Sequence, residues 1–580
     1  MDKLKKKFRD GHHAEAIAEC EALCQVEPEN REIRRLCAMM HALVGDYRRA
    51  LELLLALQEG DPNDADLLFN IGLCESKLKD FVAARQHFEL YTRKFAAHSD
   101  GWVGLAECYL ELGMPSETIS AADRAIKLDA TSIAAWLARG NGQRALGRLE
   151  DALASYRRAN QARPTVEGWT KLGQLLFEMY RPLEAIECFS QAIALAPKFG
   201  NARVLRGDAF AKLGRMDEAV ADFKTALSLS PDNAETLKKA CLSLLDQRKG
   251  LEAIELCDNT LKIDASLPAV RIVREWVLNQ LVPSWHVPMM NEPQRNQAYY
   301  DALASAVSAD KVVFEIGTGS GLLAMMAARL GARQVYTCEA IDVIADAARK
   351  IIRRNGYEDR VCVIGKHSNA VRLGDEMPAR ADLLVHEIFS SDLLGEHLLS
   401  ALEDAKERLL KTDGKVLPAA GSIMIALVGG DELGRHVFVD RSFGFDLSDF
   451  NRISSRREPL FRQDLDIAMM SMDVEAFRFD FQRQTMFPAQ TRALELTSNA
   501  SGVCYGVIQW IRVELNDALR FENHPLKRHA VANWQLIVHR FDYPIHLEPG
   551  QVVSLNAGHN RVHPWFELRS PPSRDSAQSR

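Results

Sequence analysis

The chain has 580 residues, of which 47% are hydrophobic and 26% are charged, and its formal net charge is −7. This length predicts two to four domains, and the composition is typical of a soluble globular protein. The negative net charge gives no general reason to expect a nucleic acid or an anionic membrane as a partner.

The first residues, MDKLKKKFRDGHH, are basic, but no apolar run follows them as it does in a secretory signal. No stretch approaches the roughly 18 apolar residues that a membrane span needs. The eleven cysteines are scattered and lack the spacing of zinc ligands. We therefore expect a cytoplasmic protein with reduced cysteines, no metal site and no membrane partner.

Residues 1–265 repeat themselves with a period of about 34 residues. A proline or alanine closes each unit, at Pro28, Pro62, Ala96, Ala130, Pro164, Pro197, Pro231 and Ala265. A small residue lies in the second helix expected for each unit, at Ala16, Ala50, Ala84, Thr118, Ala152, Ala185, Ala219 and Ala253. Another lies in the first helix, at Cys37, Gly72, Ala106, Gly140, Gly173, Gly207 and Cys241.

Small side chains at these points allow two helices to approach closely, and a proline ends the second helix. The unit VLRGDAFAKLGRMDEAVADFKTALSLSPDN (204–233) resembles a tetratricopeptide repeat. We expect an all-α solenoid whose groove binds a peptide or protein partner; a spacer or a dimerisation surface is the alternative. Residues 266–285 are expected to form a connector helix that ends near Pro283.

Residues 286–417 alternate between strands and helices. An apolar strand runs into the turn Gly317, Gly319, Gly321, and a helical run follows, which is the arrangement of a nucleotide-binding loop. The next expected strand, QVYTCE, ends in Glu339, where a carboxylate binds ribose hydroxyls. Glu315 inside the motif favours a ligand with an amino group. The segment therefore predicts a Rossmann-like α/β domain that binds S-adenosylmethionine, with a dinucleotide as the alternative ligand.

The segment LLVHEIFSSDLLGE (383–396) is expected to form a buried strand followed by a loop that contains Glu387 and Glu396. Two facing carboxylates are costly unless a cation lies between them, and a planar guanidinium suits such a pair. The alternative is that both glutamates are solvated loop residues. Residues 418–570 contain short strands separated by turn signals and predict a β-barrel or a sandwich. The polar tail, residues 571–580, is expected to be disordered.

Taken together, residues 283–568 resemble the protein arginine N-methyltransferases. The resemblance rests on HVPMMNEPQRNQAYY, EIGTGSG, YTCEA and HEIFSSDLLGE, with further similarity in GFDLSDF and ANWQLIV. The strings VIGKHS, EIFSSDLLGE and SLNAGHNRVHPWFEL are most similar to the branch that holds protein arginine N-methyltransferases 7 and 9. The fold expected from this resemblance is a Rossmann-like cofactor domain followed by a β-barrel for substrate binding and dimerisation.

The resemblance implies that Glu387 and Glu396 are the catalytic glutamates that hold the substrate guanidinium. It places the cofactor against His286, Met289, Arg295, Gly317, Glu339 and Ser368, beside which we also expect Glu315, Gly319, Gly321 and His367. Substrate positioning is assigned to Glu292, Asn533 and Trp534. The family commonly has a histidine at the position of Asn533 and an aspartate at that of Glu292, so a proton-bearing pair is missing here.

The function expected from the sequence is S-adenosylmethionine-dependent methylation of arginine in protein substrates that the repeats recruit. A homodimer is suggested by the resemblance alone, with dimerisation through the repeats or a monomer as the alternatives. A repeat-based scaffold with a weak or inactive methyltransferase domain is the first alternative, and Asn533 is its main support. Methylation of a small molecule is the second. Removal of residues 1–266 distinguishes this last reading, because a small substrate does not need the repeats.

Overall fold

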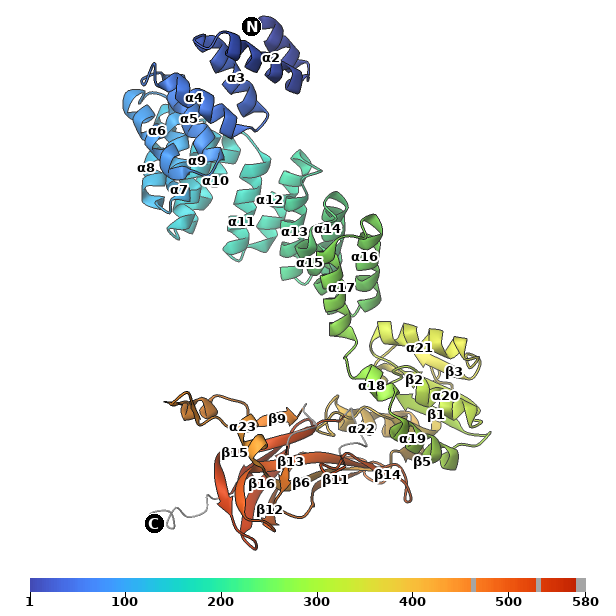
Figure 1. The fold of residues 1–580 in the computed structure, drawn as a ribbon. Helices are drawn as coiled ribbons and strands as arrows, with labels where there is room; N and C mark the ends of the chain where they lie inside the picture. Colours follow the sequence, from blue (N-terminus) through green and yellow to red (C-terminus); the bar gives the residue numbers. More distant parts are fainter. Residues whose placement is uncertain (461–465, 528–533, 570–580) are drawn as a thin grey trace. The chain divides into compact units, whose positions relative to one another are not determined.

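The computed structural model describes residues 1–460, 466–527 and 534–569. The chain divides into two compact units (Figure 1). The first unit holds Met1–Gln247 and Asn259–Val273, and the second holds Arg248–Asp258 and Arg274–Arg580.

The first unit is built of helices alone among its described residues. They are α1 (Asp2–Arg9), α2 (His13–Val26), α3 (Arg31–Leu43), α4 (Tyr47–Gln58), α5 (Ala65–Lys77), α6 (Phe81–Lys94), α7 (Ser99–Glu111), α8 (Pro115–Leu128), α9 (Ile133–Ala145), α10 (Leu149–Ala162), α11 (Val166–Glu178), α12 (Pro182–Leu195), α13 (Gly200–Lys212), α14 (Met216–Leu229) and α15 (Ala234–Asp246). Two further helices contribute residues to both units, α16 (Gly250–Ile263) and α17 (Pro268–Leu281).

Small residues set the packing distance within each pair of helices. A Cβ added at Gly173 in α11 would lie 2.5 Å from the ring of Phe189 in α12, and one at Gly207 in α13 would lie 2.6 Å from the ring of Phe223 in α14. All eight small residues expected in the second helices, from Ala16 to Ala253, are completely buried. The close helix approach predicted from the repeat pattern is therefore confirmed.

The second unit begins its fold with a five-stranded parallel sheet of order β3-β2-β1-β4-β5. Its strands are β1 (Val312–Ile316), β2 (Gln334–Cys338), β3 (Val361–Ile364), β4 (Ala381–His386) and β5 (Leu410–Leu417). The helices of this part are α18 (His286–Met290), α19 (Pro293–Ala306), α20 (Leu322–Arg329), α21 (Asp342–Arg354) and α22 (Leu398–Arg408), and one 3-10 turn is η1 (Ser368–Ala370). The parallel sheet predicted from four strands is confirmed, and β5 extends it.

The register of this sheet brings four loops to one edge. Ile316 at the end of β1 pairs with Cys338 of β2 and with His386 of β4, and Cys338 pairs with Ile364 of β3. The loops that begin at Gly317, Glu339, Gly365 and Glu387 therefore leave the sheet side by side, although they are far apart in the sequence.

The remaining strands form two antiparallel sheets and a small hairpin. The larger sheet has the order β10-β6-β13-β15-β9, with β11 paired to β6 and β14 to β13, and the smaller has the order β12-β16-β17. The elements are β6 (Ala420–Gly429), α23 (Asp431–Val437), β7 (Arg441–Ser442), β8 (Phe445–Asp446), η2 (Ser448–Arg452), β9 (Arg457–Leu460), β10 (Ala468–Met469), β11 (Val474–Asp480), β12 (Gln490–Thr497), β13 (Gly502–Glu514), β14 (Arg520–Glu522), β15 (Leu536–Leu547), β16 (Val552–His559) and β17 (Pro564–Leu568).

Neither sheet closes on itself within the described residues, so the predicted β-barrel is not confirmed. The strands β12, β16 and β17 pair only with one another, because β16 takes both of its partners from that group. One hydrophobic core nevertheless joins both antiparallel sheets to the parallel sheet, and it includes Phe314 of β1, Phe477 of β11 and Leu555 of β16.

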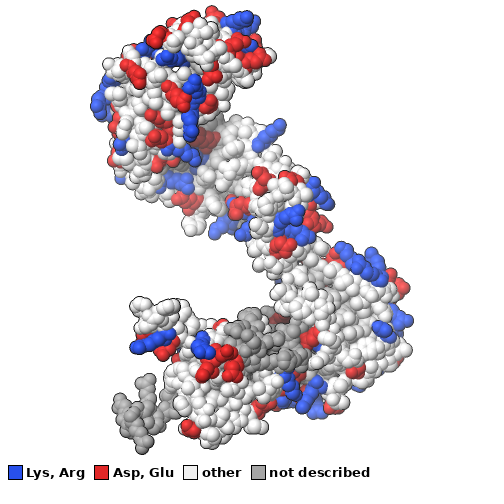
Figure 2. Space-filling view, in the orientation of Figure 1, with Lys and Arg blue, Asp and Glu red and all other residues white. Residues whose placement is uncertain are grey.

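None of the helices in the described part of the chain combines the length and the apolar character that a membrane span requires. All eleven cysteines are free thiols. On the face shown in Figure 2, Lys and Arg side chains are interspersed with Asp and Glu side chains over the repeat helices.

Candidate functional site

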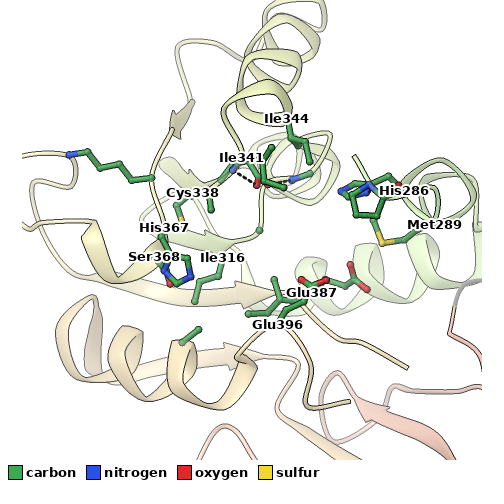
Figure 3. A pocket seen from close by; sticks show the side chains of 18 of the residues that line it. His286, Met289, Ile316, Cys338, Ile341, Ile344, His367, Ser368, Glu387 and Glu396 are labelled. Atoms are coloured by element: carbon green, nitrogen blue, oxygen red, sulfur yellow. Dashed lines mark hydrogen bonds between the residues drawn. The ribbon is translucent and has the colours of Figure 1, made fainter. Parts of the chain in front are cut away.

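A cavity of about 270 Å³ lies at the carboxyl edge of the parallel sheet (Figure 3). His286 and Met289 lie on one side of this space, His367 and Ser368 on another, and Glu387 and Glu396 border it from the loop after β4. The remaining lining residues are Pro283, Trp285, Ile316, Gly317, Gly319, Cys338, Glu339, Ala340, Ile341, Ile344, Lys366, Ile388 and Ala401.

The glycine turn after β1 brings bare backbone to the cavity. Gly317 has a φ of +85°, and a Cβ there would lie 2.8 Å from Cγ2 of Ile388. Gly321 has a φ of +80° and precedes the first residue of α20. Both positions therefore need glycine, and the turn leaves the N–H groups at the start of α20 available to a ligand.

Glu339 fixes the second wall of the cavity. Its carboxylate accepts one hydrogen bond from the N–H of Gly319 at 3.2 Å and another from the N–H of Ile341 at 3.0 Å, the two bonds drawn in Figure 3. These bonds hold the carboxylate at the end of β2, where it faces the cavity. A carboxylate held there suits a pair of ribose hydroxyls.

A smaller cavity of about 30 Å³ adjoins the first and has Arg295 and Glu315 in its wall. Nε of Arg295 and Oε2 of Glu315 are buried without a hydrogen-bond partner in the structure. Burial raises the pKa of Glu315 to about 8, and a hydrogen bond from Thr337 opposes that shift. An unmatched guanidinium donor and an unmatched carboxyl oxygen together suit the carboxylate and the ammonium of an amino acid. The methionine part of S-adenosylmethionine carries both groups, so the residues present fit that cofactor.

Arg295 and Glu387 form a buried ion pair. Nη2 of Arg295 lies 2.7 Å from Oε2 of Glu387, and the two side chains are 4% and 7% exposed. Burial raises the pKa of Glu387, Arg295 opposes the rise, and Glu396 adds to it. The guanidinium of Arg295 thus already occupies one face of a carboxylate that was predicted to bind a substrate guanidinium.

Glu396 is in a different environment. Its side chain is exposed at the cavity, and it takes part in no hydrogen bond or ion pair with the described residues. Desolvation raises its pKa, and the negative charge of Glu339 raises it further. The loop therefore presents one carboxylate that is held by an arginine and one that is free to receive a cation.

The predicted substrate-positioning residues are only partly described. Glu292 is buried directly before the first residue of α19. Its negative charge raises the pKa of both Arg295 and Glu387. Nε1 of Trp534 donates a hydrogen bond to the carbonyl oxygen of Phe389 at 3.3 Å, in the loop between the two glutamates. Asn533 lies outside the described residues, so its predicted role in positioning the substrate stays a prediction.

Some lining residues were not identified from the sequence. The ring of Trp285 stacks on that of His286 with centroids 4.0 Å apart and an angle of 12° between the planes. Ile341 and Ile344 form the apolar wall after β2. The signals that could have identified them are an aromatic residue next to the expected His286 and apolar residues shortly after Glu339.

Two family models match parts of the chain. The model described as tetratricopeptide repeat matches residues 44–99 and 170–234, and the model described as ribosomal protein L11 methyltransferase matches residues 298–420. The repeat identity that the sequence predicted is thereby confirmed.

Two of the similar proteins come from Streptomyces and from mouse. The chain is 35% identical over 280 residues to the arginine N(omega)-methyltransferase of Streptomyces achromogenes subsp. streptozoticus, an alignment that covers 48% of this chain and 76% of that protein. It is 28% identical over 334 residues to protein arginine N-methyltransferase 7 of Mus musculus, covering 51% of this chain and 48% of the relative. The chain thus spans about half the length of the animal relatives it matches.

One solved structure similar to the chain is the Trypanosoma brucei PRMT1 enzyme-prozyme heterotetrameric complex with AdoHcy. The identity is 21% and the TM-score is 0.42, and the match covers 48% of this chain and 90% of that one.

Proposed function

Because the chain belongs to the family of arginine N-methyltransferases, we propose that it transfers the methyl group of S-adenosylmethionine to a guanidinium nitrogen of arginine in protein substrates. Membership confirms the family resemblance drawn from the sequence. The observation that carries the proposal is the meeting of Glu387 and Glu396 in one cavity with the glycine turn and Glu339.

The chain's own residues hold the cofactor by its charged groups. We assign its carboxylate to Arg295, its ammonium to Glu315 and its ribose to Glu339. His286 donates Nδ1–H to the carbonyl oxygen of Pro283 at 3.1 Å and turns its ring to the cavity. When bound, S-adenosylmethionine supplies an activated methyl group.

The two glutamates prepare the substrate. A guanidinium is protonated at neutral pH and is a poor nucleophile, because its lone pairs are delocalised. Carboxylates on two sides draw the positive charge toward the nitrogens they contact, so the third nitrogen keeps more of its lone pair. Glu396 is exposed and without a partner among the described residues, so it is the better placed of the two to take up the proton that the nitrogen loses.

We assign substrate recruitment to the repeat domain, residues 1–265, and substrate contact to the lobe of residues 418–570, which we regard as barrel-like. The connector, residues 266–285, joins the repeats to the cofactor domain of residues 286–417. The interspersed charges on the repeat face in Figure 2 favour a partner recognised by shape and local contacts over a strongly charged one.

A homodimer is part of the proposal. Exposed apolar side chains gather on the segment around β7, β8 and η2: Phe443 is fully exposed, and Phe445, Phe450 and Ile453 are 71%, 62% and 79% exposed. A cluster of large apolar side chains in water indicates a surface that another molecule covers. We assign it to a second copy of the chain.

A free arginine substrate is the alternative, because the name of the Streptomyces relative gives arginine without a protein. The test supplies labelled S-adenosylmethionine with an arginine-containing peptide, with the same peptide carrying lysine, and with free arginine. Label in the arginine peptide alone supports the proposal, and label in free arginine alone supports the alternative. Cofactor binding without any transfer supports the scaffold reading.

A further inference from the structure

The loop that carries both glutamates has an unusual backbone. Leu393, Glu396 and His397 have φ angles of +68°, +56° and +58°, a region that residues with a side chain rarely adopt. Such conformations persist only where surrounding contacts hold them, and they gather at functional sites. The position of the Glu396 carboxylate therefore depends on whatever holds this loop.

Part of the support comes from the loop itself. Oγ of Ser390 accepts hydrogen bonds from the N–H of Asp392 at 3.1 Å and from the N–H of Gly395 at 2.9 Å. Gly395 approaches Ser390 so closely that an added Cβ would lie 2.4 Å from the Ser390 Cβ. These contacts close the turn but do not anchor it to the rest of the protein.

The anchor comes from the β lobe. The guanidinium of Arg457 makes a two-point contact with the Asp392 carboxylate: Nη2 lies 2.7 Å from Oδ2, and Nε lies 3.2 Å from Oδ1. The Asp392 side chain is only 6% exposed, whereas that of Arg457 is 41% exposed. Next to this pair, the N–H of Gln535 donates to Oγ of Ser391 at 2.9 Å.

The base of Arg457 is itself fixed. Arg457 starts β9 and pairs with His539 of β15 in the large sheet. The turn before it is held by the buried guanidinium of Arg540, which donates to the carbonyl oxygens of Ser454 and Ser455 at 2.9 and 2.8 Å. A planar, two-point contact from such a base fixes distance and orientation together.

We propose that Arg457 is a positioning residue for methyl transfer, acting through Asp392 to hold Glu396 where the substrate guanidinium is bound. This inference rests on the proposed function. Arg457 does not line the cavity, and only its effect on the loop connects it with the reaction. Because Asp392 is buried, Arg457→Ala leaves a buried carboxylate without this counter-charge and should lower stability as well. The effect on positioning is therefore measured by kcat and by hydrogen exchange of the loop at a temperature where the variant is folded.

The chain offers a control pair with the same geometry. Arg478 of β11 also makes a two-point contact with a carboxylate, that of Glu514 in β13, and its side chain is 40% exposed, close to the 41% of Arg457. The two pairs differ in the burial of the acid, because Glu514 is 31% exposed and Asp392 is 6% exposed. The pair of Arg478 and Glu514 lies in the same lobe as Arg457 and does not line the cavity. The full-length variants to compare are therefore Arg457→Ala, Arg457→Lys, Asp392→Asn, the double variant Arg457→Ala/Asp392→Asn, and Arg478→Ala.

Three assays are run on each variant: steady-state kinetics with an arginine peptide, which give kcat and KM, calorimetry for the Kd of S-adenosylhomocysteine, and hydrogen exchange of the segment 388–398. We expect Arg457→Ala and Asp392→Asn to lower kcat by on the order of a hundredfold, the scale that a misplacement of about 1 Å can cost. Cofactor Kd should change less than about threefold, and exchange of the loop should rise. Arg457→Lys should recover part of kcat, and the double variant should be no worse than the worse single one.

Equal kcat values for Arg457→Ala and Arg478→Ala would overturn the proposal, as would unchanged loop exchange or additive effects in the double variant. A wild-type protein without turnover would contradict the proposed function instead. Calorimetric binding of the arginine peptide in the presence of S-adenosylhomocysteine then tests the positioning, with a loss of affinity of at least about tenfold expected for Arg457→Ala only. Equal peptide affinities of the wild type and Arg457→Ala would refute the positioning role.

Discussion

The two glutamates of the candidate site should respond differently to the same substitution. Glutamine keeps the size of glutamate and removes its charge. Glu387 is paired with Arg295 inside the protein, whereas Glu396 is exposed and has no partner among the described residues. Both substitutions should abolish most turnover, but only one of them should destabilise the fold.

The magnitudes follow from these environments. Loss of a charged hydrogen bond costs about 1.5–3 kcal/mol, and Glu387→Gln leaves the buried Arg295 without a counter-charge. Burial already raises the pKa of Glu387, so removing its charge returns part of this cost. We expect a net loss of about 1–2 kcal/mol, or roughly 1–3 °C in the melting of the second unit. Glu396→Gln should change stability by less than about 0.5 kcal/mol.

Turnover should fall by on the order of 10²–10³ in each variant, the cost of removing one charge-stabilising group from an active site. Thermal melting, calorimetric titration with S-adenosylhomocysteine and a methyl-transfer assay provide the three readouts. Cofactor affinity of Glu396→Gln should equal that of the wild type. Turnover of Glu396→Gln within about threefold of the wild type would refute the role of Glu396 in holding the substrate guanidinium, and a parallel loss of cofactor binding would assign the loop a structural role.

Three further outcomes are expected. Burial raises the pKa of Glu315 to about 8, so below that pH an ammonium ligand competes with a proton for this carboxylate. Cofactor affinity should therefore rise about tenfold per pH unit from pH 6 toward 8, and binding should release a proton in calorimetry; Glu315→Gln should flatten this dependence. Trp285→Ala should weaken S-adenosylhomocysteine binding about three- to tenfold, because the ring of Trp285 lines the cavity. The same variant should lose part of the change in tryptophan fluorescence that cofactor binding causes in the wild type. Gly207→Leu should lower the melting temperature of the first unit by overpacking against Phe223, at a cost of about 1–3 kcal/mol or more, with cofactor binding unchanged; Gly200→Ala, whose Cβ has its nearest neighbour at 3.8 Å, is the control.

Local patterns made most of the fold predictable. The repeats were predictable because residues of the same kind recur at a fixed period. Each recurring set has one packing role: Gly173 and Gly207, for example, each pack against an aromatic ring of the next helix. The parallel sheet was predictable because β1 to β4 are short runs rich in apolar residues, and α20 and α21 follow β1 and β2 directly. The arrangement of the β lobe was not, because β12 pairs with β16, about 60 residues away, and nothing in either strand specifies that partner.

The site was predictable wherever a side chain follows a strand end directly. Glu339 and Glu387 meet because parallel strands place their carboxyl ends at one edge. The ion pair between Arg295 and Glu387 was not foreseen, because the two residues were assigned to different ligands. The contact of Arg457 with Asp392 could not be predicted either. An arginine at the start of a strand belongs to no recognisable motif, and its partner lies in a loop of the parallel-sheet domain.

The central claim is that the loop after β4 holds a guanidinium beside the cofactor. The measurement that tests it most directly incubates purified protein with labelled S-adenosylmethionine and a mixed cell extract, then hydrolyses the proteins and identifies the labelled amino acid. Label in methylarginine with the wild type, and none with Glu396→Gln, is the predicted result. Cofactor binding without labelled methylarginine, or equal label with both proteins, would contradict the claim.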